Sequence, residues 1–214
     1  MTRLDRRVRV FAACLAALAG YVDAIGFLQL GGFFVSFMSG NTTRLGVGLA
    51  QAPSSALVAG GLIGTFLIGV VLGALVGRAA GAHRRPAVLL LVAGLLAAAA
   101  GLHSVGAPRL TIVAMGLAMG AENAVFEENG DVRIGLTYMT GTLVKLGQRI
   151  AAAVLGGDRW AWTPYLLLWS GLLIGAIAGA LSYPPLGLAS LWLAAGAAAV
   201  LALVATVLGS GELA

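Results

Sequence analysis

Six long apolar stretches, separated by short polar segments, dominate the hydrophobic pattern of this chain. They lie at residues 10–30, 57–78, 86–105, 109–126, 164–182 and 187–208. Each has roughly the 20 residues that an α-helix needs to cross a hydrocarbon core of about 30 Å. The pattern predicts an all-α integral membrane protein with six transmembrane helices.

Two further segments, 33–50 and 137–154, have apolar ends and a polar, glycine-containing centre. Ser39-Gly40-Asn41 lies in the first centre and Thr140-Gly141 in the second. Backbone that is irregular inside a bilayer needs partners from the protein or from a water-filled cavity. We expect each segment to be a re-entrant or broken helix. A kinked helix whose hydroxyls bond its own carbonyls, and a segment that crosses fully, are the alternatives.

The two polar segments are similar in sequence. Residues 37–46 (FMSGNTTRLG) align with residues 138–147 (YMTGTLVKLG) at an offset of 101, with four identical and three similar positions. Upstream, residues 20–23 match residues 120–123 at an offset of 100. Apolar composition alone would not easily produce the first match, so we infer a duplication.

A third match follows in the same order. Residues 67–75 align with residues 173–181 at an offset of 106. The sequence therefore predicts a first unit over residues 1–105 and a second over residues 106–214, both within one membrane domain. The pairs Gly69/Gly73 and Gly175/Gly179 also predict close helix packing, within the chain or between subunits.

The basic residues indicate how the units are oriented. If the two polar segments do not cross, each unit has three spans and the second unit is inverted relative to the first. With the N-terminus in the cytoplasm, eleven of the 13 basic residues then lie inside, and only Arg44 and Arg109 lie outside. If both segments cross, seven lie inside and four outside, with Arg44 and Lys145 in the membrane. The positive-inside rule favours a 3+3 inverted-topology repeat with both termini in the cytoplasm.

Composition supports this class and excludes others. Hydrophobic residues make up 60% of the chain and charged residues 10%, whereas a soluble domain carries about 25% charged residues. The net charge of +5 does not indicate nucleic acid, because the basic residues lie in loops between apolar runs. The expected partners are the lipid bilayer, a small solute and a second copy of the chain, since one six-span protomer encloses only a narrow pathway.

Metal and redox chemistry have little support in the sequence. Cys14 is the only cysteine, and His83 and His103 are far apart. We therefore expect no intrachain disulfide, no metal site and no cofactor. A separate local signal, Tyr183-Pro184-Pro185, predicts a turn.

Candidate solute-binding residues gather at the two breaks and at matched positions in the flanking spans. The expected set is Asp23, Ser39, Asn41, Thr42, Thr43, Arg44, Asn123, Thr140, Thr142 and Lys145. Hydroxyl and amide groups, together with the N–H groups at helix N-termini, suit a polar solute. Arg44 and Lys145 favour an anion, with snorkelling to the interface as their alternative role.

Two carboxyl groups at membrane depth are candidate proton carriers. Asp23 lies well inside the first span, and Glu122 lies near the end of the fourth. An ionisable residue inside a membrane indicates function by default, with structural pairing as the alternative. We expect Glu122 to lie near the cytoplasmic interface in contact with water, which makes Asp23 the preferred carrier.

The predicted function is a transporter or channel for a small polar solute or anion, with its site at the midplane between the two breaks. A non-transporting scaffold or partner-binding membrane protein is the main alternative. An intramembrane serine hydrolase built on Ser39 and His103 is disfavoured, because the second unit repeats the serine as Thr140 but has no matching histidine. We therefore expect no enzymatic activity and no catalytic residue.

The motifs quoted above also resemble a known family. Residues 20–34 (GYVDAIGFLQLGGFF), 38–42 (MSGNT) and 139–143 (MTGTL) resemble the YoaK family of bacterial inner-membrane proteins over most of the chain. That family has no known function, so the resemblance implies a location in the bacterial cytoplasmic membrane. This chain departs from the family pattern at Glu122, where members have glutamine, and at Glu127-Glu128, where members have basic residues.

Overall fold

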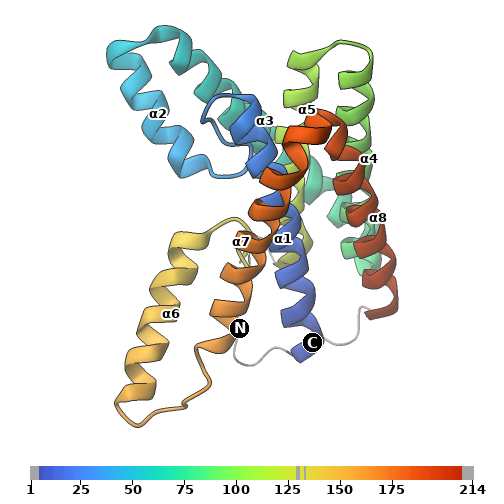
Figure 1. The fold of residues 1–214 in the computed structure, drawn as a ribbon. Coiled ribbons are helices and arrows are strands. Elements are labelled where there is room, and N and C mark those ends of the chain that lie inside the picture. The colour runs from blue at the N-terminus through green and yellow to red at the C-terminus, as the bar shows by residue number, and fades with distance from the viewer. Residues whose placement is uncertain (1–4, 129–130, 133, 209–214) are drawn as a thin grey trace.

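The computed structural model describes residues 5–128, 131–132 and 134–208, which form a bundle of eight α-helices (Figure 1). The helices are α1 (Arg6–Gln29), α2 (Met38–Gln51), α3 (Pro53–Ala80), α4 (Arg84–Ser104), α5 (Pro108–Glu122), α6 (Met139–Val154), α7 (Thr163–Leu186) and α8 (Leu191–Leu208). The 3₁₀ turns η1 (Gly81–His83), η2 (Asn123–Phe126) and η3 (Gly187–Ser190) follow α3, α5 and α7. Between α5 and α6, strands β1 (Glu127–Glu128) and β2 (Asp131–Val132) form one short antiparallel pair, which leaves the class all-helical.

Each of the six predicted spans corresponds to one helix. The helices α1, α3, α4, α7 and α8 have 24, 28, 21, 24 and 18 residues, and α5 has 15 and continues into η2. Three helical stretches are long and apolar enough to cross a membrane: Arg6–Gln29, Pro53–Ser104, which holds α3 and α4, and Thr163–Leu208, which holds α7 and α8. These helices support the predicted class, a helical membrane protein.

The helix α7 extends further than the sequence pattern predicts. The turn expected at Tyr183-Pro184-Pro185 is wrong, because both prolines lie inside the last turn of α7. The fixed φ of proline suits a helix, and near the C-terminal end its missing N–H weakens only the final turn. The chain turns instead at Gly187, whose φ of 56° lies in the left-handed region that glycine adopts without strain.

A row of glycines lets α7 pack backbone to backbone against α1. Each glycine lies against one carbonyl oxygen of α1: Gly171 against Ala13, Gly175 against Ala17, and Gly179 against Tyr21. A Cβ atom at any of the three would overlap that oxygen. Only glycine therefore permits this close approach, which is how helices gain packing energy where lipid replaces water.

The contact between α3 and α5 repeats the contact between α7 and α1. Gly69 and Gly73 of α3 lie against the carbonyl groups of Leu117 and Ala121 of α5. Gly69 and Gly73 align with Gly175 and Gly179 at an offset of 106. Their partners Leu117 and Ala121 align with Ala17 and Tyr21 at an offset of 100. Both offsets also occur in the sequence alignment. The predicted small-residue pairs thus pack within the chain.

The outward faces of the bundle carry large apolar side chains. Leu57 and Leu67 of α3 are 79% and 61% exposed, and Leu181 of α7 is 72% exposed. The buried core between the helices is also apolar and consists mainly of alanine, leucine, valine and methionine. Helices that are apolar both inside and outside are those that face lipid.

Candidate solute-binding site

The two short helices, α2 and α6, are the centre of the candidate site. They have 14 and 16 residues, so they rise only about 21 and 24 Å at 1.5 Å per residue, less than the roughly 30 Å of a hydrocarbon core. The helix α2 packs on α3, and α6 packs on α7. In the view of Figure 1, α2 runs upward and α6 downward, and each starts near mid-height of the bundle.

Asp23 fixes the loop that leads into α2. One carboxylate oxygen of Asp23 accepts the backbone N–H groups of Val35 and Ser36, each at 2.8 Å. A carboxylate that accepts two N–H groups anchors extended backbone strongly, because such bonds are charge-assisted. Asp23 therefore ties the later part of α1 to the residues just before α2.

Asn123 lies at the aligned position, 100 residues after Asp23, and holds the loop before α6. Its Nδ2 donates to the carbonyl of Met119 at 2.9 Å, and its Oδ1 accepts the hydroxyl of Thr137 at 3.2 Å. Thr137 lies 101 positions after Ser36, the offset that also relates the two short helices. At both places a polar residue near the end of a long helix holds the loop that precedes the short helix.

Asn41 is fully buried in the first turns of α2 and bonds back to the same loop. Its Oδ1 accepts the N–H of Phe34 at 3.1 Å, and its Nδ2 donates to the carbonyl of Phe34 at 2.6 Å. The oxygen and the nitrogen of the Asn41 side-chain amide are thus both bonded to the backbone of Phe34. Asn41 shapes the site by holding the loop.

The threonines of the two motifs bond to their own helices. Thr42 donates to the carbonyl of Met38 at 2.9 Å, Thr43 to that of Ser39 at 3.3 Å, and Thr142 to that of Tyr138 at 3.3 Å. These are the bonds expected for hydroxyls that turn back on the preceding turn of a helix. Thr42 and Thr43 are exposed, whereas Thr142 is buried.

The first turns of both short helices keep unused N–H donors. Neither Phe37 nor Tyr138, the residues that precede α2 and α6, supplies a side-chain cap. Within the described residues, the N–H groups of Ser39 and Gly40, and those at the matching positions 140 and 141, have no acceptor. Uncapped helix starts of this kind are suited to a solute with negative or partly negative atoms.

The glycines of the two motifs make room for aromatic rings. A Cβ atom at Gly40 would overlap the ring of Phe37, and one at Gly141 would overlap the ring of Tyr138. The ring of Phe37 also packs edge-on against that of Phe34, with centroids 5.1 Å apart. Ser39 and Thr140, which precede the glycines, are exposed.

Arg44 and Lys145 align in sequence but differ in their surroundings. The guanidinium of Arg44 lies 4.9 Å from the centre of the Phe33 ring and fills the space beside Gly32. Lys145 is exposed on α6. The first cation is therefore held over the loop before α2, while the second projects outward from its helix.

Glu122 is buried inside the protein. The expectation that Glu122 contacts water is wrong, because its side chain is 0% exposed. Neither carboxyl oxygen has a hydrogen-bond partner among the described residues. Asp23, the carboxyl preferred from sequence, has two backbone partners, so Glu122 is the one that structural bonding does not explain.

The sequence reasoning missed one charged pair near this end of α5. Arg84 bonds the carboxylate of Glu127 at 2.5 Å, and its Nε donates to the carbonyl of Ala124 at 3.2 Å. The pair joins the start of α4 to η2 and β1. Both charges are present in the sequence, but nothing in their spacing indicates that they pair.

The fold and these residues define a polytopic helical membrane protein with two matched short helices. The chain belongs to the family described as "Protein of unknown function (DUF1275)", which matches residues 11–204. It is 40% identical over 204 residues to UPF0700 transmembrane protein RA0705 of Rhizobium meliloti, covering 92% of this chain and 86% of that protein. It is 34% identical over 148 residues to UPF0700 transmembrane protein YoaK of Bacillus subtilis, covering 64% of each. The resemblance to the YoaK family is thus confirmed, and no solved structure matches.

Proposed function

We propose that this protein is a transporter or channel for a small polar solute or anion. The observation that carries the proposal is the pair of short helices whose uncapped first turns lie near mid-height of the bundle. Half-length helices that point their N-termini at a common region are a recurring device for binding solutes at the membrane midplane. The solute would bind between the start of α2 and the start of α6.

The proposal includes an inverted repeat of residues 1–105 and 106–214. It is supported by contacts in both directions, since Gly20 lies against the carbonyl of Leu172, and Gly120 against that of Phe66. Gly20 and Gly120 are 100 positions apart, and their partners Phe66 and Leu172 are 106 positions apart, as in the alignment. In Figure 1, α1 begins and α8 ends at the same end of the bundle, as an even number of spans requires. We place that end in the cytoplasm of a bacterium because of its basic residues.

The candidate residues divide into two groups under this proposal. Ser39 and Thr140, with the free N–H groups of their turns, contact the solute, and Arg44 and Lys145 raise the local positive potential. Asp23, Asn41 and Asn123, with Thr42, Thr43 and Thr142, hold the loops and first turns in place. We propose Glu122 as the carboxyl that takes up a proton during transport, with Asp23 as a positioning residue.

Flux into proteoliposomes tests the proposal directly. The purified protein is reconstituted and assayed with a panel of small anions and neutral solutes, using swelling and a pH-sensitive dye. We expect flux for at least one solute, and a loss of about thirtyfold in the double variant Ser39→Ala/Thr140→Ala, because each hydroxyl contributes about 1 kcal/mol. The control Ser54→Ala/Thr206→Ala removes two exposed hydroxyls elsewhere and should leave flux unchanged. Absence of flux for every solute would remove the proposal and leave the partner-binding alternative.

An enzymatic role is not part of the proposal. Ser39 lies in the first turn of α2, whereas His103 is exposed in the last turn of α4. Among the described residues the two side chains share no hydrogen bond. A serine nucleophile needs a base within hydrogen-bond reach, and we propose that Ser39 contacts the solute instead.

A further inference from the structure

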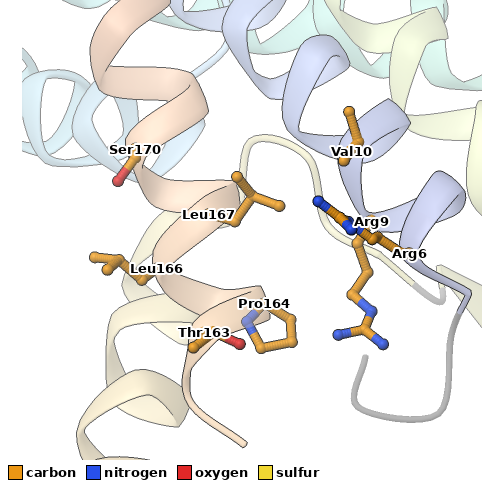
Figure 2. Close-up of a pocket in the computed structure, with 8 residues that line it drawn as sticks. All are labelled: Arg6, Arg9, Val10, Thr163, Pro164, Leu166, Leu167 and Ser170. Carbon is orange, nitrogen blue, oxygen red and sulfur yellow. The ribbon is translucent and has the colours of Figure 1, made fainter. Parts of the chain in front are cut away.

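A groove lies between the starts of α1 and α7, and the residues that line it come from these two helices (Figure 2). It has a volume of about 510 Å³ and is lined by Arg6, Arg9, Val10, Thr163, Pro164, Leu166, Leu167 and Ser170. Figure 2 shows the arginine side chains of α1 directed into the space between the two helices, opposite the start of α7. The groove therefore joins two cationic groups to a mostly apolar wall.

The lining of the groove carries two positive charges, those of Arg6 and Arg9. None of the eight lining residues is acidic. Arg7 and Arg159 lie close by in sequence, as do Asp5, next to α1, and Asp158, whose carboxylate accepts the N–H of Trp160 at 2.9 Å. Guanidinium groups bind phosphate oxygens through paired N–H donors, so the polar part of the groove suits a phosphate group.

The rest of the groove suits a hydrocarbon chain. Val10, Leu166 and Leu167 are 47%, 36% and 40% exposed on this wall. Trp160 and Trp162 precede α7, and their rings are 6.3 Å apart. Tryptophan at the end of a membrane helix marks the headgroup level of a bilayer. A ligand here meets cations at the headgroup level and apolar side chains along the helices.

We propose that the groove between the starts of α1 and α7 binds an anionic phospholipid, with its phosphate on Arg6 and Arg9 and an acyl chain along Val10, Leu166 and Leu167. A free phosphate ion would use the cations but not the apolar wall. Basic pockets between membrane helices at the cytoplasmic side are known to take anionic headgroups. The site is independent of the proposed solute pathway.

The test compares lipids by their effect on thermal unfolding of the delipidated, detergent-purified protein. Phosphatidylglycerol, phosphatidylcholine and inorganic phosphate are each titrated into the wild type, into Arg6→Gln/Arg9→Gln and into Arg78→Gln/Arg149→Gln. The last variant is matched in charge, and both of its arginines are exposed outside the groove. Native mass spectrometry of the same samples counts the lipids that each protein retains.

We expect phosphatidylglycerol to raise the unfolding temperature of the wild type and of the matched variant by about 5 °C at saturation. The shift should be lost, along with one retained lipid, in Arg6→Gln/Arg9→Gln, and phosphatidylcholine and phosphate should give no shift. Because each shift is measured against the same variant without lipid, a change in basal stability does not obscure the result. Equal shifts from both lipids, a shift from inorganic phosphate, or an equal shift in both double variants would overturn the proposal.

Discussion

The carboxylate of Asp23 accepts the backbone N–H of Ser36 at 2.8 Å and so joins the first long helix to the loop before the first short one. The same oxygen holds Val35 at the same distance. Before α6, the side chain of Asn123 accepts a hydrogen bond from the hydroxyl of Thr137 in the same way. Two different kinds of bond thus hold the same kind of loop, a carboxyl oxygen that accepts backbone N–H groups before α2 and a side-chain amide bonded to a hydroxyl before α6.

Replacing Asp23 should separate its structural effect from any role in chemistry. Asp23→Ala leaves two N–H groups without their acceptor, so we expect the free energy of unfolding to fall by about 2–4 kcal/mol. Asp23→Asn keeps an acceptor oxygen and should lose about 1 kcal/mol. Titration with SDS in mixed micelles measures both. Equal losses in the two variants would show that the oxygen at position 23 does not hold the loop.

Asn41 should be intolerant of substitution although it carries no charge. Asn41→Ala leaves both polar groups of Phe34 unpaired, so we expect a loss of about 2–3 kcal/mol. Asn41→Asp should be no better, because a carboxylate cannot donate to the carbonyl of Phe34 and would place a charge in a buried site. The readout is limited proteolysis of residues 30–37 together with thermal unfolding. Gln148→Ala, an exposed change on α6, is the control and should leave both unchanged.

The two glycine contacts should respond alike to an added methyl group. Gly175→Ala and Gly69→Ala each place a Cβ onto a carbonyl oxygen of the facing helix, so we expect losses of about 1–3 kcal/mol. Gly196→Ala meets nothing within 4 Å in α8 and should stabilise by up to about 1 kcal/mol. A loss at one matched glycine without a loss at the other would contradict equivalent packing.

The buried carboxyl of Glu122 should lower the free energy of unfolding of the protein. Neither of its oxygens has a partner among the described residues, so replacement by methionine, of similar length, should raise the free energy of unfolding by about 1–3 kcal/mol. If Glu122 takes up a proton during transport, the same change should abolish proton-coupled flux. A destabilised Glu122→Met protein would mean that the carboxyl has a bonding partner after all.

The sequence predicts much of the fold and less of the site. Six spans follow from apolar length alone, and the glycine rows follow from spacing, because both patterns are local and repeat. The roles of Asp23 and Asn41 did not follow, since their partners are backbone groups of a loop whose path no side-chain pattern encodes. The burial of Glu122 was also missed, because hydropathy places a residue along a span but does not determine which face of the helix points inward.

Cysteine labelling tests the central claim, that α2 and α6 enter the membrane from opposite faces. In a Cys14→Ala background, Gln51→Cys marks the end of α2 and Leu155→Cys the residue after α6; both positions are exposed. A membrane-impermeant maleimide is applied to intact cells and to inverted vesicles. The account predicts that position 51 reacts only from outside and position 155 only from the cytoplasmic side. Labelling of both positions from the same side would contradict it.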